Sequence, residues 1–472
     1  MRFLICLFLF VLPAISFAKL QLPSVISNGM VLQQDTEVKI WGSSDTEDLV
    51  VIKPSWSDRT YRAYPGKDGR WSVKIETLKA DFKQYTLTIS QKGETISLEG
   101  LMFGEVWLCT GQSNMEMKMK GYYGKPIIGG RKAIADGGKY DVHIFEVPKA
   151  SLGSRQFDCK AKWQAPSPQA VANISAAAYF FGKQLFETLN VPVGLVVAPW
   201  GGASVLAFMS DDAFVDFPQF KLPPKQATNL GNMAPTGIFN GMIHPILGYT
   251  IKGCIWYQGE TDRKTPDLYR KLYASMLRDW RKKWEIGDFP MVYAQIAPFD
   301  YPDGNSAYLR EAQMKCQEEN SNTFMISLMD VGERHDIHPS NKEIVGFRMA
   351  MKALDKVYNI SGISSAEPLY KSHRIEGSKV VLTFKNAENG LTTYGKPLTG
   401  FAVAGADRVF YPAVAKLKKT EIVVYSDKVA APVAVRYAFT DYAEGCLFNV
   451  EGCCASSFRT DTWAEESCKF EN

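Results

Sequence analysis

The stretch GEVWLCTGQSNMEM (104–117) contains a short apolar strand followed at once by a glycine and a serine. Val106, Trp107 and Leu108 are typical of a buried strand, and Ser113 comes just after its end. Over about residues 101–360, strand-like apolar runs of this kind alternate with helical segments. This βαβα order predicts an α/β core with a mostly parallel sheet and helices on both of its faces.

Local signals predict where three of these helices begin. Ser175 is the candidate cap of a helix through Leu189, and Pro266 marks the start of a helix over residues 268–284. Ser340 and Glu343 form an S-x-x-E capping box that opens another helix.

Further motifs are predicted to follow strands of the same sheet. WGG (200–202) comes after the run 193–197, QGE (258–260) after the run 251–257, and DIHP (336–339) after the run 324–328. The carboxyl ends of parallel strands meet at one edge of a sheet, where functional residues gather. The sequence therefore predicts a site at that edge, built from loops far apart in the chain.

The residue types in these motifs suit acyl transfer. A serine hydroxyl needs a base to take its proton, and histidine does this best near neutral pH, so Ser113 is the predicted nucleophile and His338 its base. Asp336 is the nearest carboxylate in sequence and the predicted partner of the imidazole. The oxyanion needs fixed donors, for which we assign the N–H groups of Ser113 and Gly202 and the side-chain amide of Gln258.

Several of these residues have structural roles as alternatives to catalytic or substrate-binding ones. His244 is the main rival to His338 among the five histidines, but its apolar neighbours indicate a buried structural residue. A buried amide that satisfies its own hydrogen bonds is the less favoured alternative for Gln258. Trp200 and Glu260 are candidate substrate contacts, although large aromatic residues near a sheet edge more often belong to the core.

The chain is predicted to be β-rich on both sides of the core. A basic start, an apolar run and small residues before Lys19 indicate a signal peptide over residues 1–18. Alternating patterns predict a β-sandwich-like domain over residues 19–100, before the core at 101–360, and a β-rich domain over 361–472. We expect export to the periplasm or the extracellular space, with no membrane insertion of the mature chain.

Composition excludes some partners and sites. The net charge of +4 falls to +3 when Arg2 is removed, and the basic residues are scattered, so no nucleic-acid partner is expected. No C-x-x-C or H-E-x-x-H spacing occurs, so neither a metal nor another cofactor is predicted. Cys109, Cys254 and Cys316 are expected to be buried thiols. An exported chain permits disulfides, most plausibly among Cys446, Cys453, Cys454 and Cys468.

In combination, these motifs make the chain resemble the sialate O-acetylesterase family and related bacterial carbohydrate acetylesterases. The segments that carry the resemblance are VLQQDTEVKIWG (31–42), GEVWLCTGQSNMEM (104–117), APWGGAS (198–204), FNGMIHPI (239–246), IWYQGETD (255–262), DIHPSNKEIVGFRMA (336–350) and AVRYAFTDYAEGCLFNVEG (434–452). The resemblance implies a three-layer α/β/α SGNH-hydrolase core flanked by N- and C-terminal β-domains. It also implies metal-free cleavage of acetylated sugars, with Ser113 as nucleophile, His338 as base, and Gly202 and Gln258 as oxyanion donors.

The chain departs from the family pattern in places that affect the site. The glutamine motif often continues Ser-Asn in the family, where this chain has Thr261-Asp262. Many SGNH enzymes carry the orienting aspartate three residues before the histidine, but His335 stands there. Asp336, a more distant carboxylate, or a Ser–His dyad without a carboxylate are the alternatives that follow.

We therefore expect a secreted serine esterase that removes acetyl groups from carbohydrates through an acetyl-Ser113 intermediate. O-acetylated sialic acids are the first substrate hypothesis, and acetylated xylan or another plant polysaccharide is the second. A non-catalytic carbohydrate-binding protein is the alternative of another class, and a lipase or thioesterase is a further enzyme alternative. The acetyl position, the oligomeric state and the role of the β-domains are left open by the sequence.

Overall fold

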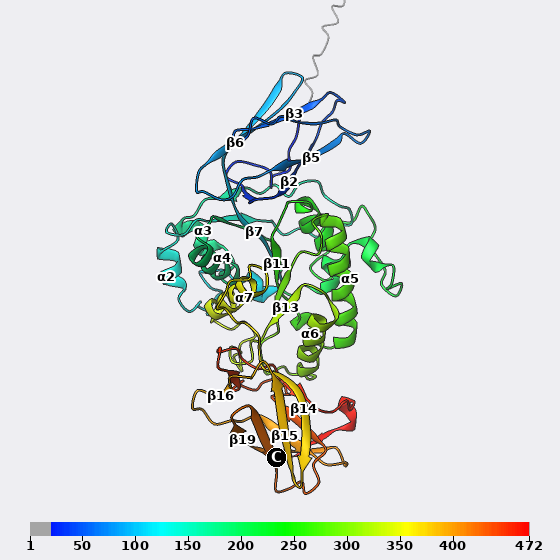
Figure 1. The fold of residues 1–472 in the computed structure, drawn as a ribbon. Helices are drawn as coiled ribbons and strands as arrows, with labels where there is room; N and C mark the ends of the chain where they lie inside the picture. Colours follow the sequence, from blue (N-terminus) through cyan, green and yellow to red (C-terminus); the bar gives the residue numbers. More distant parts are fainter. Residues whose placement is uncertain (1–19, 472) are drawn as a thin grey trace, which may run out of the picture.

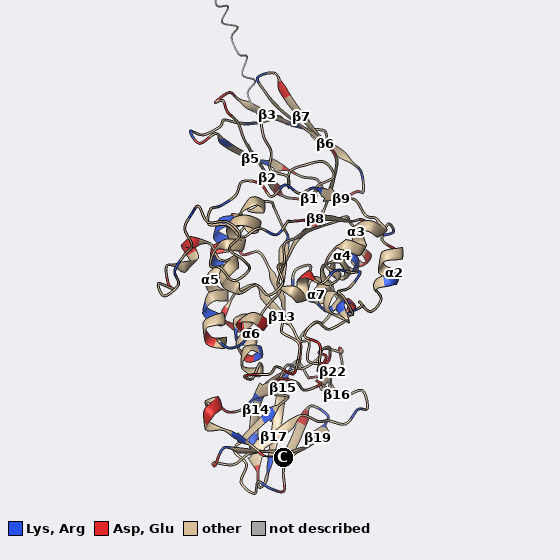
Figure 2. Cartoon of the chain, turned by 180° about the vertical axis from the view of Figure 1, so that it is seen from behind, with Lys and Arg blue, Asp and Glu red and all other residues tan. Residues whose placement is uncertain are grey.

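A computed structural model describes residues 20–471, and the predicted signal peptide at residues 1–18 lies outside them. The chain passes through a β-rich region, a central region with helices around a sheet, and a second β-rich region at the opposite end (Figure 1). Basic and acidic residues are interspersed along the chain in these regions (Figure 2). Within residues 20–471, no helix combines the length and the apolar character needed to cross a bilayer.

Parallel strands form the centre of the molecule. They follow the order β13–β12–β11–β7–β10–β8, each strand is parallel to its neighbour, and β9 pairs antiparallel with β8 at the edge. Their bounds are β7 (Glu94–Gly111), β8 (Val142–Glu146), β9 (Trp163–Gln164), β10 (Val193–Val197), β11 (Gly253–Tyr257), β12 (Met291–Ala294) and β13 (Thr323–Ile326). The predicted α/β class is confirmed, and the complete sheet is mixed because antiparallel strands join it from the N-terminal region.

Helices cover both faces of this sheet (Figure 1). Val106 and Leu108 of β7 pack in one apolar cluster with α5 and α6, whereas Trp107 and Cys109 pack in another with α4 and α7. A strand that is buried on both sides explains the continuous apolar run in its sequence. The helices are α1 (Ser113–Glu116), α2 (Gly130–Ala135), α3 (Pro168–Asn173), α4 (Ala176–Leu189), α5 (Pro266–Trp284), α6 (Ala307–Glu319) and α7 (Lys342–Lys356). Short helical turns are η1 (Val205–Phe208), η2 (Asp211–Phe214), η3 (Phe239–Ile243), η4 (His244–Ile246), η5 (Glu260–Asp262) and η6 (Glu465–Ser467).

Local sequence signals explain where several helices begin. Ser175 caps α4 as predicted, and its side chain accepts the N–H of Ala178 at 3.1 Å. Pro266 opens α5 as predicted. The capping box predicted at Ser340 is wrong, because Asn341 caps α7. The Ser340 hydroxyl instead donates to the Glu333 carboxylate at 2.7 Å, so the bond joins two positions of the loop before α7.

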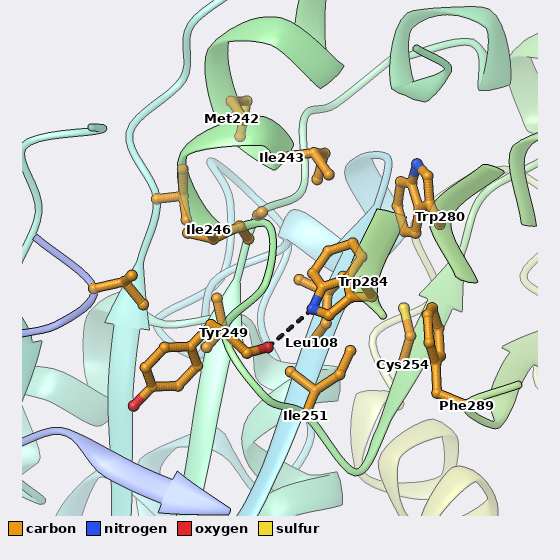
Figure 3. Close-up of a cluster of buried hydrophobic side chains, with 14 of the residues drawn as sticks. Leu108, Met242, Ile243, Ile246, Tyr249, Ile251, Cys254, Trp280, Trp284 and Phe289 are labelled. Atoms are coloured by element: carbon orange, nitrogen blue, oxygen red, sulfur yellow. Dashed lines mark hydrogen bonds between the residues drawn. The ribbon is translucent and has the colours of Figure 1, made fainter. Parts of the chain in front are cut away.

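An aromatic cluster fastens α5 to the sheet (Figure 3). Trp284 lies against Phe289, with ring centres 5.8 Å apart, and its Nε1 donates to the carbonyl oxygen of Tyr249 at 2.9 Å. Trp280 packs beside Trp284. Cys254 of β11, a buried free thiol, belongs to the same cluster. This packing holds β11, and with it the loop that follows, in a fixed position.

The N-terminal β-rich region continues directly into the core. The first part of β7 pairs with β6, and its last part pairs with β10 and β11, so the predicted boundary at residue 100 falls inside one strand. The other strands are β1 (Val31–Gln33), β2 (Glu37–Ser43), β3 (Val50–Pro54), β4 (Tyr61–Ala63), β5 (Arg70–Glu76) and β6 (Tyr85–Gln91). A shared strand gives the two regions a continuous backbone ladder.

The C-terminal β-rich region packs on the core through α6. The fully buried Arg310 of α6 donates to the hydroxyl of Ser457 at 3.1 Å and to the carbonyl oxygen of Thr440. The strands are β14 (Leu369–Glu376), β15 (Lys379–Lys385), β16 (Leu391–Thr392), β17 (Phe401–Ala404), β18 (Val409–Pro412), β19 (Val414–Lys418), β20 (Glu421–Tyr425), β21 (Ala434–Tyr437), β22 (Phe448–Asn449), β23 (Phe458–Arg459) and β24 (Lys469–Phe470). The main ladders are β14–β15–β20–β19 and β23–β21–β17–β18–β24.

The cysteines of residues 20–471 are all free thiols. The bridge that the sequence permits among the last four is therefore absent from these residues, and this region is held by packing and ion pairs. The buried, unbridged state predicted for Cys109, Cys254 and Cys316 is confirmed.

Replacing Arg436 with methionine is expected to destabilise the C-terminal region. Arg436 and Asp461 are each 2 % exposed, and Nε and Nη2 of the arginine donate to the carboxylate at 2.9 and 2.8 Å. Removing the cation leaves a buried carboxylate without its main partner, which costs about 3–5 kcal/mol. Chemical denaturation measures the decrease in the free energy of unfolding. Arg374→Met is the matched control, because its pair with Glu421 is exposed and is expected to contribute little. Equal stability of the two variants would contradict the prediction.

Candidate active site

The chain turns sharply at the carboxyl end of β7, where the predicted nucleophile lies. Gly111 has φ +139°, and a Cβ atom there would fall 2.2 Å from the carbonyl oxygen of Tyr257. Only glycine fits this approach. Gln112 then donates its N–H to the same carbonyl at 2.9 Å, and Ser113 begins α1. The turn places Ser113 over the junction of β7 and β11.

The glycine loop after β10 touches Ser113. A Cβ atom on Gly201 would lie 3.4 Å from the Cβ of Ser113, and the N–H of Gly201 itself donates to the Glu116 carboxylate. Within residues 20–471, the N–H groups of Ser113 and Gly202 have no hydrogen-bond partner. Both N–H groups, which lie on adjoining loops, can therefore donate to an oxyanion, as their predicted role requires.

Tyr122 contacts both His338 and the turn that carries Ser113. The Tyr122 ring meets the imidazole edge-on at a centre distance of 5.7 Å, and its hydroxyl donates to the carbonyl oxygen of Ser113 at 3.4 Å. No hydrogen bond joins Ser113 Oγ to another group within residues 20–471, and such bonds often tighten only when substrate binds. Burial, with the nearby charges of Lys125 and Lys342, lowers the pKa of His338 to about 4. The imidazole is therefore neutral near pH 7, as a base must be.

Asp336 lies beside His338 but is bonded to Lys125. Its Oδ1 accepts from Lys125 Nζ at 2.6 Å and from the backbone N–H of His338 at 2.8 Å, while the imidazole Nδ1 is 3.7 Å away. Partial burial acts to raise the pKa of Asp336, but the hydrogen bond from Lys125 lowers it below its usual value. Lys125 Nζ also lies 3.5 Å from His338 Nδ1. No sequence motif points to Lys125, which is separated from Asp336 by 211 positions.

Gln258 does not fit its predicted role as an oxyanion donor. Its side chain is completely buried, and Nε2 donates to the carbonyl oxygen of Ala203 at 3.0 Å and to the carboxylate of Asp262. Both amide hydrogens are thus used inside the protein. Asp262 also accepts from the Ser204 hydroxyl at 2.6 Å. Gln258 and Asp262 together brace the glycine loop against the glutamine loop.

The predicted substrate contacts fare differently. Glu260 is only 4 % exposed and accepts from Asn114 Nδ2 at 2.5 Å, so it lies beneath the site rather than on its surface. Burial raises the pKa of Glu260. Trp200 is partly buried, and its backbone N–H donates to the carbonyl oxygen of Gly111 at 3.0 Å. The centre of its ring is 5.8 Å from Lys149 Nζ. Trp200 therefore borders the nucleophile turn.

A hollow of about 580 Å³ opens beside this edge of the sheet. Glu116, which bonds the glycine loop, forms part of its wall together with Pro199 and the basic side chains of Lys118, Lys149 and Lys162. The hollow adjoins the carboxyl ends of β8 and β10, so it lies on the same edge as Ser113.

Comparison with known proteins identifies the family. The model of the family "Carbohydrate esterase, sialic acid-specific acetylesterase" matches residues 103–355. The chain belongs to this family. As a carbohydrate esterase, the protein is a carboxylic ester hydrolase.

Relatives of this carbohydrate esterase are similar over most of its length. Human sialate O-acetylesterase is 26% identical over 386 residues, covering 73% of this chain and 72% of that protein. The mouse sialate O-acetylesterase is 24% identical over 487 residues and covers 89% of each chain. Among solved structures, the carbohydrate acetylesterase XAC1771 from Xanthomonas citri has a TM-score of 0.85 and 31% identity, covering 94% of this chain and 100% of that one.

Replacing Lys125 with methionine is expected to move the acid limb of the esterase's pH–rate profile to higher pH. The ammonium group opposes protonation of His338, so its removal raises the pKa of the imidazole from its low value of about 4. With His338 as the base, activity is lost as pH falls through that pKa, so the variant loses activity sooner on acidification. The kcat/KM for 4-nitrophenyl acetate across acidic pH measures the shift. Lys120→Met, whose exposed amine bonds Asn173, is the control, and superimposable profiles for wild type and Lys125→Met would refute the prediction.

Proposed function

We propose that the protein is an exported serine esterase that hydrolyses O-acetyl esters on sialic acids through an acetyl-Ser113 intermediate. The observation that carries the proposal is the meeting of Ser113 and His338 around Tyr122 at the carboxyl edge of the sheet. The N–H groups of Ser113 and Gly202 on adjoining loops supply the third requirement of acyl transfer, donors for the oxyanion.

The reaction proceeds in two steps. Ser113 Oγ attacks the ester carbonyl carbon while His338 takes its proton, and the oxyanion accepts from the N–H groups of Ser113 and Gly202, each worth about 10²–10³ in rate. The tetrahedral intermediate then expels the sugar alcohol, which receives the proton from His338, and acetyl-Ser113 remains. Water, deprotonated by His338, attacks the acetyl carbon, acetate leaves, and the proton returns to Ser113 Oγ.

Asp336 is the proposed carboxylate of the site. It already holds the backbone of His338, and its Oδ1 is 3.7 Å from the imidazole Nδ1. A movement of about 0.5–1 Å would make this a hydrogen bond. That bond would fix the proton on Nδ1 and leave Nε2 to accept the proton of Ser113.

The names of the relatives and the chemistry of the hollow support the sialic acid assignment. Lys118, Lys149 and Lys162 line the hollow beside the site, where Glu146 and Glu116 pair with the first two. Ammonium groups suit the carboxylate of a sialic acid, which an acetylated xylose unit lacks. The resemblance also supports a three-layer α/β/α SGNH-type core at 101–360 with β-domains at 19–100 and 361–472, and the pattern at 1–18 supports export.

Acetate release from 9-O-acetylated sialic acid and from acetylated xylan tests the substrate, with Ser113→Ala as the background control. Release from the sialic acid is the expected result. Release from xylan alone would replace sialic acid by a plant polysaccharide. A panel of nitrophenyl esters is expected to show a preference for acetyl, whereas a preference for long acyl chains would favour a lipase or thioesterase.

Labelling by a fluorophosphonate separates the esterase from a carbohydrate-binding protein of another class. Such a probe modifies a serine only when a base activates it. We expect modification of Ser113 in wild type and its loss in Ser113→Ala. An unlabelled wild type that binds glycans without releasing acetate would favour the binding protein.

A further inference from the structure

Lys342, in the first turn of α7, is a buried amine beneath the active site. Its side chain is 0 % exposed, its Nζ donates to Asn114 Oδ1 at 2.5 Å, and the same atom lies 5.5 Å from the ring centre of Tyr257. An ammonium group is costly to bury unless its partners compensate.

Asn114 joins three segments of the site through its amide. Its Oδ1 accepts from Lys342, and its Nδ2 donates to Glu260 Oε1 at 2.5 Å and to the carbonyl oxygen of Ile337 at 3.0 Å. The amide thus binds α7, the glutamine loop and the segment before α7. Asn114 directly follows Ser113, and Ile337 directly precedes His338. The network therefore connects the proposed nucleophile and base through their neighbours in sequence.

We propose that Lys342 is a positioning residue of the esterase, which holds the Ser113 turn and the His338 loop at the separation needed for proton transfer by fixing the amide of Asn114. The proposal rests on the roles of Ser113 and His338 proposed above. Proton transfer requires hydrogen-bond distance between these two side chains. A displacement of about 1 Å at such a pair costs about 10²-fold in rate.

The charge of Lys342 acts on His338 as well. The charged groups that face His338 are Lys125, Lys342, Asp336 and Glu116. Those that face Lys342 are Glu260, Glu333 and Asp336. Burial lowers the pKa of Lys342 to about 7, and its positive charge helps to lower that of His338. Losing this charge therefore has an electrostatic consequence in addition to the loss of the hydrogen bond.

Lys342→Met tests the proposal with kcat, KM and the pH profile for 4-nitrophenyl acetate. We expect kcat to fall about 10²-fold, with KM within about twofold of wild type, because the bound substrate keeps its contacts while the proton transfer is misaligned. The acid limb of kcat/KM is expected to move to higher pH, since a cation near His338 is gone. A purely structural role would change neither the pH profile nor kcat selectively.

Lys352→Met is the matched control on the same helix. Lys352 is 3 % exposed, and its Nζ donates to Glu367 Oε2 at 2.7 Å, away from the site residues. Both variants lose a buried ammonium group, so a similar fall in melting temperature is expected, but only Lys342→Met should change kcat. The double variant Lys342→Met/Glu260→Gln removes both buried charges and is expected to fold with the same low kcat.

Equal kcat values in Lys342→Met and Lys352→Met, or an effect confined to KM, would overturn the positioning role. If Lys342→Met does not fold, the kcat of the double variant is compared with that of Lys352→Met instead. Fluorophosphonate labelling of Ser113 in wild type separates the two levels of inference. An unlabelled wild type refutes the proposed function, whereas a labelled wild type with unaffected Lys342 variants refutes the positioning role alone.

Discussion

Replacing Ser113 with alanine is expected to lower kcat for acetate release by about 10⁴- to 10⁶-fold. Without Oγ no acetyl-enzyme forms, and the water reaction that remains is helped only by the N–H groups of Ser113 and Gly202 and by substrate binding. That remainder corresponds to about 10³-fold over the uncatalysed reaction. Initial rates at saturating substrate measure the loss, and KM is expected to change little because no substrate-binding group is removed.

The stability of Ser113→Ala serves as its control. The hydroxyl makes no hydrogen bond within residues 20–471, so the melting temperature should match that of wild type. A variant that melts normally and has lost turnover would establish Ser113 as the nucleophile. Acetate release that survives in the folded variant would remove Ser113 from this role.

Replacing His338 with glutamine is expected to reduce kcat by a similar factor, about 10⁴–10⁶. Glutamine retains polarity and size but cannot take a proton from Ser113 or from the deacylating water. Because nucleophile and base act as a unit, the double variant with Ser113→Ala should be no slower than either single variant. The same acetate assay at neutral pH measures both.

His244→Gln is the control for His338. The His244 ring is partly buried, and its Nδ1 lies 2.6 Å from the carbonyl oxygen of Gln156, as expected of a structural histidine. We expect a loss of stability with kcat preserved. Loss of turnover in the folded His244→Gln variant together with an active His338→Gln variant would reassign the base.

The elements that the sequence predicted well are those that depend on near neighbours. Ser175 caps α4 by a bond to Ala178, three residues away, and Pro266 begins α5 because its fixed φ suits a first turn. At α7 the capping pattern points to Ser340, one residue from the true cap Asn341. The Ser340 hydroxyl instead donates to the side chain of Glu333, seven residues earlier, and the capping pattern does not extend to that position.

The site was predictable where it follows from strand direction. Motifs after parallel strands must meet at one edge, so the proximity of the Ser113 turn to the glycine loop at Gly201 follows from the βαβα order. The orientation of side chains in those motifs was not predictable. Gln258 turns inward to Ala203 and Asp262, and Glu260 is buried against Asn114, because each satisfies hydrogen bonds within the protein.

The amino-acid sequence alone indicates the class of fold, the position of the motifs at one sheet edge, and the residue types for acyl transfer. The folded chain sets the contacts of Lys125 with Asp336 and of Lys342 with Asn114, which span 211 and 228 positions of sequence. It also decided that the cysteines of residues 20–471 stay unbridged. The physical reason is the range of the forces involved. Periodicity and capping act over a few residues, whereas ion pairs, buried amides and thiol distances depend on how distant segments pack.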